Sequence, residues 1–269
     1  MRSAILLVAY GIGSDQGRHA LRGFDAKVRQ RWPGMPVRWA YTSLLLRERM
    51  ALTRQKTDSV FKAVSRLALE KFERVAVQPL QTVPGQEHEA VCVAVREASS
   101  RWGLHTGVGA PLLQTPDDIR STAEALIRHL PLERGPEEDV ILMGHGTRHD
   151  AVSRYVELAK AVRELDRHVH VGVMNGAVSL EDILSELVSP RVWLAPLLSV
   201  VGRHTLEDMA GHSGQSWRGR IEAAGRKCLP VLVGTAEYAG VAEIWLRHLD
   251  DVVRSLVCVG DEVTGCEYC

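Results

Sequence analysis

The feature that most constrains the fold of this chain is an alternation of short apolar runs with segments of helical periodicity, which restarts half-way along the sequence. Runs such as Ala4–Ala9 and Val140–Met143 are short and apolar, as buried strands are. Between the runs, segments such as residues 21–32 carry apolar side chains three or four positions apart. Alternating strands and helices form parallel sheets that are covered by helices on both faces. The sequence therefore predicts an α/β fold.

Each half of the sequence predicts a similar set of elements. In the first half we expect strands over residues 4–9, 37–41 and 75–78 and near Val108, and helices over residues 21–32, from about 58 to 68, and over 91–98. In the second half we expect strands over residues 140–143, 169–174, 192–197 and 229–233, and helices over residues 155–165, 180–187, 217–224 and 241–256. We therefore predict two similar lobes, each a parallel four-stranded sheet flanked by helices.

Two segments of the first half recur in the second half in the same order. Residues 7–11 (LVAYG) align with residues 142–146 (LMGHG), and residues 79–85 align with residues 196–202. Both segments follow predicted strands, where open α/β sheets bind ligands, so we expect an active-site cleft between the lobes. The expected organisation is a first lobe over residues 1–130, a polar linker with proline and glycine over 131–138, a second lobe over 139–257 and a cysteine-containing tail over 258–269.

Composition excludes several classes of partner. The chain has 33 basic and 33 acidic residues, so no net charge attracts nucleic acid or an anionic membrane. No apolar run approaches the roughly 20 residues of a membrane span, and the first apolar run is too short for a signal peptide. Five scattered cysteines do not make a disulfide framework. We expect a cytoplasmic protein with neither a membrane nor a nucleic-acid partner.

Two histidines are the candidates for chemistry. His145 lies between two glycines directly after a predicted strand, and His204 follows Gly202 beyond another strand of the same half. Neutral imidazoles bind Co²⁺, Ni²⁺, Fe²⁺ and Zn²⁺, so two of them at neighbouring strand ends suit one metal ion. The alternative is that His145 only fills a turn and that residues 201–212 form a solvated loop.

Several ordered motifs carry a family resemblance. Residues 84–89, 144–149, 195–204, 208–211, 216–218 and 222–225 resemble the anaerobic, class II sirohydrochlorin cobaltochelatases, over nearly the whole chain. The resemblance implies a two-lobed, ferrochelatase-like fold with the macrocycle in the cleft. It also implies a metal chelatase, a lyase of cobalamin and tetrapyrrole biosynthesis that inserts a divalent ion into sirohydrochlorin without ATP or another nucleotide. Co²⁺ is the expected ion, with Fe²⁺ and Ni²⁺ left open, and family members commonly form homo-oligomers.

The resemblance also implies roles for particular residues. The metal-handling histidines fall on His145 and His204, and His145 also accepts pyrrole N–H protons as a base, in sequence with its role as ligand. Asn175 stands where the family has a glutamate ligand, which leaves a weaker donor there or moves the duty to Glu181, Glu207 or a substrate carboxylate. Gln81 stands where the family tends to carry a histidine. These departures keep open a non-catalytic or divergent tetrapyrrole- or metal-binding protein on the same scaffold.

Further residues are expected to bind the substrate. In the first lobe we expect Tyr10, Gln81, Glu87 and His88 to contact the macrocycle, unless they only make local hydrogen bonds. Arg148 and Arg203 are candidate anchors for its carboxylates, through charge-assisted hydrogen bonds, or are simply exposed. Three tail cysteines are either a metal-binding group or part of a frayed, reduced tail, namely Cys258, Cys266 and Cys269.

Overall fold

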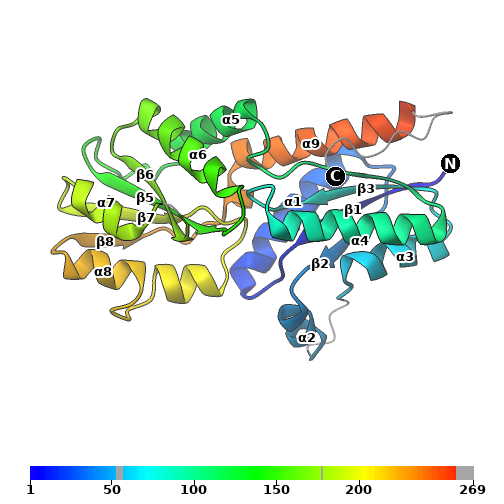
Figure 1. Cartoon of the computed structure of the whole chain (residues 1–269), viewed down its shortest axis with the longest axis horizontal. Coiled ribbons are helices and arrows are strands. Elements are labelled where there is room, and N and C mark those ends of the chain that lie inside the picture. The colour runs from blue at the N-terminus through cyan, green and yellow to red at the C-terminus, as the bar shows by residue number, and fades with distance from the viewer. Residues whose placement is uncertain (53–56, 177, 259–269) are drawn as a thin grey trace. The chain divides into compact units, whose positions relative to one another are not determined.

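Two parallel sheets organise the chain, whose computed structural model describes residues 1–52, 57–176 and 178–258 (Figure 1). The first sheet has the order β2-β1-β3-β4 and the second has the order β6-β5-β7-β8. The strands of the first sheet are β1 (Ser3–Ala9), β2 (Val37–Tyr41), β3 (Arg74–Pro79) and β4 (His105–Val108). Those of the second are β5 (Asp139–Gly146), β6 (Val169–Asn175), β7 (Arg191–Pro196) and β8 (Lys227–Pro230). Because both sheets share one order and all strand pairs are parallel, the prediction of two similar four-stranded lobes is confirmed.

The internal alignment of the sequence is confirmed at the level of single hydrogen bonds. Leu80 N donates to Val8 O at 2.8 Å, and Leu197 N donates to Met143 O at the same distance. These are equivalent positions in the alignment of residues 7–11 with 142–146 and of 79–85 with 196–202. Each bond joins the residue after one strand to the neighbouring central strand, so the two sheets end in the same way.

Helices connect the strands in both units. The first connections contain α1 (Asp15–Arg31), α2 (Leu44–Leu52), α3 (Val60–Leu69), α4 (Gln86–Trp102) and α5 (Pro116–Arg128). The later ones contain α6 (Val152–Leu165), α7 (Leu180–Glu186), the π-helix η1 (His204–Met209), α8 (Trp217–Ala223), the 3₁₀ turn η2 (Thr235–Glu237) and α9 (Ala239–Cys258). Among the described residues, no helix combines the length and apolarity that crossing a membrane requires.

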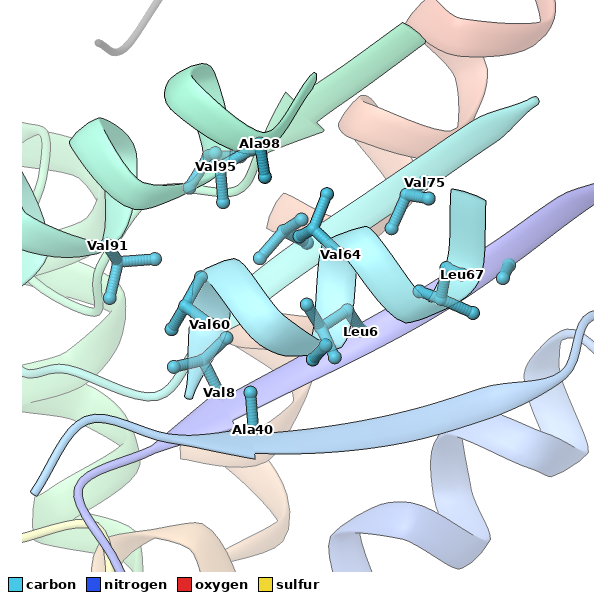
Figure 2. Close-up of a cluster of buried hydrophobic side chains, with 14 of the residues drawn as sticks. Leu6, Val8, Ala40, Val60, Val64, Leu67, Val75, Val91, Val95 and Ala98 are labelled. Atoms are coloured by element: carbon cyan, nitrogen blue, oxygen red, sulfur yellow. The ribbon is translucent and has the colours of Figure 1, made fainter. Parts of the chain in front are cut away.

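The first sheet is packed against α3 and α4. Figure 2 shows apolar side chains of these helices over those of the strands, among them Val64 of α3, Val95 of α4 and Leu6 of β1. Burying each such side chain contributes roughly 1.5–3 kcal/mol. The β1 run Ala4–Ala9 is almost entirely buried, which explains why it reads as a continuous apolar segment instead of an alternating one.

The second sheet presents one set of alternate residues to α7, η1 and α8. Ile141 and Met143 of β5 share a buried cluster with Ile183, Met209 and Trp217, which come from those three helices. Since side chains alternate across a strand, the next residue of β5 on this face is number 145. The packing therefore directs the end of β5 toward the face that η1 covers.

Several details differ from the sequence expectations. The strand expected over residues 229–233 runs over Lys227–Pro230, because β8 pairs with the first four residues of β7. Helices α2 and α5 were not predicted. The start of α5 nevertheless has a local signal, a capping box between Thr115 and Asp118 with Pro116 at the first helical position.

Contacts divide the chain into two compact units that do not follow the sequence halves exactly. One unit comprises residues 1–12, 22–112 and 243 onward, and the other comprises residues 13–21 and 113–242. The expected linker, residues 131–138, lies between α5 and β5 within the second unit. Helix α5 packs against α6, which explains why it groups with the second sheet although it precedes that linker.

Candidate metal-handling site

His145 is held at the end of β5 by two glycines. A Cβ on Gly144 would lie 2.8 Å from the ring of Tyr155, and one on Gly146 would lie 1.9 Å from the carbonyl oxygen of Asn175. Gly146 also has a φ of +77°, which side chains other than glycine rarely adopt. Only glycines allow this close approach, so the exposed side chain of His145 is carried by a rigid, tightly packed backbone.

His204 begins the π-helix η1, which is anchored by its buried residues. Thr205 and Met209 are both fully buried, and Ala210 N donates to Thr205 O at 3.0 Å in the i→i+5 pattern of a π turn. Such turns are rare and occur frequently at functional sites. The side chain of His204 is 42% exposed. Its backbone is therefore held by the buried residues of η1, while the side chain remains open to solvent.

The structure brings His145 and His204 together. Their ring centroids are 5.0 Å apart, with an angle of 74° between the ring planes. With metal–nitrogen bonds of about 2.1 Å, two imidazoles on one ion would have centroids about 4.5 Å apart at a right angle and about 5.2 Å apart at the tetrahedral angle. The observed separation lies between these values, so the two rings are spaced to share one ion.

The same nitrogen is available on both rings. Nδ1 of His145 lies 3.1 Å from the carbonyl oxygen of Gly146, and Nδ1 of His204 lies 2.6 Å from Oδ2 of Asp208. A carbonyl or a carboxylate only accepts, so each Nδ1 must carry the proton and donate it. In the neutral rings Nε2 therefore keeps its lone pair, which is the form that binds a metal.

Asn175 lies beside His145 at the end of β6. It pairs in register with Gly146, and it is exposed. Its neutral carboxamide stands where, as the resemblance implies, the family has a charged glutamate ligand. Within the described ranges, no group of three or more His, Cys, Asp or Glu side chains is arranged to hold a metal ion. The two imidazoles are thus an incomplete set of ligands.

Two glutamates considered as replacement ligands are engaged elsewhere. Glu207 accepts from Arg203 Nε at 2.7 Å, and Glu181 forms an ion pair with Arg220. Arg203 is therefore already paired with a carboxylate, whereas Arg148 is exposed in the loop after β5. Of the two arginines expected to anchor the substrate, Arg148 has the freer surroundings.

The first-unit candidates differ widely in exposure. Tyr10 is 50% exposed directly after β1, at the position equivalent to His145, and Glu87 is exposed in the first turn of α4. Both side-chain amide atoms of Gln81 are buried without a hydrogen-bond partner among the described residues. His88 is only 3% exposed, and burial lowers the pKa of its ring to about 4. That burial argues against the predicted contact of His88 with the macrocycle, and all four contacts remain predictions.

Asp208 is the residue that the sequence reasoning missed. It lies within the motif over residues 208–211, for which the sequence predicts no particular role. The available signal is its spacing from His204, since residues four apart on a helix face one another. The tail is a separate case, because Cys266, Cys269 and the side chain of Cys258 lie outside the described residues.

The sequence and the fold of this chain are matched by known proteins. The family model described as "Cobalt chelatase (CbiK)" matches residues 3–254. The chain belongs to this family. It is 52% identical to the sirohydrochlorin cobaltochelatase CbiKC of Nitratidesulfovibrio vulgaris, over 95% of this chain and 92% of that protein. It is 28% identical to the sirohydrochlorin cobaltochelatase of Salmonella typhimurium, over 96% of this chain and 98% of that one.

Solved structures agree on the chelatase fold. The sirohydrochlorin chelatase SirB from Bacillus subtilis subspecies spizizenii, in complex with cobalt, superposes with a TM-score of 0.65 at 14% identity, covering 95% of this chain and 97% of that one. SirB from Bacillus subtilis with Fe³⁺ gives a TM-score of 0.63 at 15% identity, covering 96% of each chain. At such identities the likeness establishes the fold alone. The family assignment rests on the sequence relatives.

Proposed function

We propose that this member of the cobalt chelatase family inserts Co²⁺ into sirohydrochlorin. The observation that carries the proposal is the His145–His204 pair, with ring centroids 5.0 Å apart and Nε2 available on both rings. Family membership and a relative that is 52% identical support the same reaction. Co²⁺ is the substrate metal, and the macrocycle is the second substrate.

An incomplete ligand set suits delivery better than storage. Two imidazoles hold the arriving ion while water fills other positions, and within the described residues no group of three or more His, Cys, Asp or Glu side chains is arranged to hold the ion more tightly. Four nitrogens of the macrocycle then replace the imidazoles. Because the macrocycle offers more donors than the protein does, the ion passes forward.

Proton removal completes the reaction. Insertion of one divalent ion into the free-base macrocycle releases two pyrrole N–H protons, which keeps the charge in balance. Once the ion has left His145, Nε2 of that ring is free to accept one of these protons while water accepts the other, and the exposure of the ring lets water carry both protons away. The roles of ligand and base therefore follow one another at a single atom. Asn175, being neutral, leaves the ion weakly held before transfer.

The substrate carboxylates require positive partners outside the metal pair. Arg148 lies in the loop that directly follows β5 and His145, and it is exposed, so it is our first candidate for a carboxylate anchor. Arg203 is the second candidate, and it would have to release Glu207 in order to bind a carboxylate of the substrate. The predicted homo-oligomer, the cytoplasmic location and a metal-binding role for the tail cysteines remain proposals from the sequence.

An anaerobic absorbance assay tests the proposed function. The purified chain is mixed with sirohydrochlorin and Co²⁺, and then with Fe²⁺ or Ni²⁺, beside the variants His145→Ala and His204→Ala. We expect many turnovers with Co²⁺ and a loss of at least about 100-fold in either variant, since each removes half of the metal ligands.

His212→Ala is the matched control, because His212 is exposed in the same unit and contacts Arg218 instead of the histidine pair. It should retain wild-type turnover. A stoichiometric change in absorbance without metal insertion above the uncatalysed rate would contradict the proposal and favour a tetrapyrrole-binding relative.

A further inference from the structure

The strongest polar contact of the metal-handling pair comes from Asp208. Its Oδ2 lies 2.6 Å from Nδ1 of His204, a distance typical of charge-assisted hydrogen bonds. Both residues belong to η1, and both side chains are a little over 40% exposed. The hydrogen bond therefore lies within one short element. It uses Nδ1 of His204, whereas Nε2 is the nitrogen that would bind the metal.

The bond decides which nitrogen of His204 can bind metal. A free neutral imidazole exchanges between two tautomers, and only one of them has its lone pair on Nε2. The carboxylate of Asp208 accepts a hydrogen bond from an Nδ1 that carries a proton. It repels the lone pair of an Nδ1 that carries none. For His145, the carbonyl of Gly146 makes the same selection. The two rings thus reach the same tautomer through two different acceptors.

The backbone of η1 supports this geometry. Residues four apart on a helical turn lie on the same face, which places the side chain of Asp208 beside that of His204. The turn is held by the bond from Ala210 N to Thr205 O and by the buried side chains of Thr205 and Met209. With its backbone fixed in this way, Asp208 orients the ring of His204 as well as selecting its tautomer.

We propose that Asp208 is a positioning residue for His204, which sets the orientation and the Nδ1–H tautomer with which that ring receives the substrate metal. This inference rests on the proposed function of the histidine pair. Carboxylates that orient metal-binding histidines raise the basicity of the ligand, and their removal typically costs 10–100-fold in metal affinity or activity. Asp208 itself does not contact the ion.

The competing explanation is an ordinary ion pair that stabilises a helical turn. Arg218 and Glu222 form such a pair at the same spacing on α8, at 2.9 Å. Pairs of that kind contribute about 0.2–0.5 kcal/mol to a helix and have no effect on a tautomer. Glu222→Gln is therefore a control that matches Asp208→Asn in chemistry and spacing.

The test measures the tautomer, the metal affinity and the kinetics of the full chain. In ¹⁵N-labelled protein, long-range histidine spectra report which ring nitrogen of His204 carries the proton. Visible absorption of Co²⁺ reports binding without the macrocycle, and the insertion assay separates KM for Co²⁺ from kcat. The carboxamide introduced by Asp208→Asn can either accept a hydrogen bond from Nδ1 or donate one to it. The variant therefore keeps the shape of the side chain but no longer selects one tautomer of His204.

We expect His204 to show the Nδ1–H tautomer in the wild-type chain and in the Glu222→Gln variant, with Co²⁺ affinities within twofold of each other. Asp208→Asn and Asp208→Ala should show mixed tautomers, a Co²⁺ affinity lower by 10–100-fold, and a KM for Co²⁺ that rises more than kcat falls. Unchanged tautomer and affinity in Asp208→Asn would overturn the inference, as would equal losses in Glu222→Gln. If the wild-type chain binds Co²⁺ but inserts none, the proposed function fails, while the spectra and the titration still decide the role of Asp208.

Discussion

At the scale of single residues, Asn175 has the clearest consequence for the substrate metal. It pairs with Gly146, the neighbour of His145, and contributes a neutral carboxamide. We predict that Asn175→Glu tightens Co²⁺ binding by about tenfold, because a carboxylate adds a charged donor beside the paired imidazoles. Product formation should slow in the same variant, since an ion held more tightly is passed on less readily. Equilibrium titration and single-turnover insertion measure the two effects.

The control for this variant is Asn175→Gln, which has nearly the shape of glutamate without its charge. It should bind Co²⁺ within about twofold of the wild-type chain. Equal affinities of the Glu and Gln variants would show that the side chain at this position does not reach the ion.

His88 makes stability depend on pH. Burial lowers its pKa to about 4, whereas an unfolded histidine titrates near 6.5. Between these values the unfolded chain binds a proton that the folded chain does not, so stability is full above about pH 6.5 and falls as the pH is lowered. The loss attributable to His88 is about 3 kcal/mol by pH 4. His88→Leu should flatten the dependence of unfolding free energy on pH, as measured by urea denaturation at a series of pH values.

The comparison for this prediction is the dependence of unfolding free energy on pH in the wild-type chain. A slope in His88→Leu as steep as that of the wild-type chain would mean that other buried groups, such as His170 with its pKa lowered by burial, carry the whole effect.

At the scale of elements, the end of β5 depends on its glycine. Gly146 combines a φ of +77° with a carbonyl oxygen at 1.9 Å from the position of a Cβ. We predict that Gly146→Ala destabilises the fold by about 2 kcal/mol or more and displaces His145. Urea denaturation and the insertion assay measure the two effects. Gly202→Ala, with nothing within 4 Å of its Cβ position, should cost far less, and equal costs would contradict the assigned strain.

At the scale of the whole molecule, the second unit takes part of its structure from a remote segment. Residues 13–21 group with residues 113–242, and Ser14 Oγ donates to Val201 O at 2.5 Å. We predict that a fragment of residues 113–242 alone does not fold stably, because it lacks this segment. Adding a peptide of residues 13–31 should increase its protection from hydrogen exchange. A fragment that is as protected by itself as in the full chain would refute the prediction.

The sequence by itself determined all eight strands of the described residues, most of the helices, the parallel pairing and the duplication, because these depend on the local spacing of apolar residues and on the recurrence of two segments. It also located His145, whose flanking glycines mark a strand end of unusual conformation. Helix α5 was missed because its apolar spacing was not recognised, although its capping box was readable.

Only the tertiary structure decided the geometry of the site. The 5.0 Å separation of His145 and His204 depends on how β5 and η1 pack, and no local pattern encodes the distance between residues so far apart in the sequence. The π turn that pairs His204 with Asp208 and the burial of His88 were likewise invisible beforehand. The physical reason is that apolar periodicity reports what one segment buries, whereas tautomers, burial and ligand spacing depend on which other segments it meets.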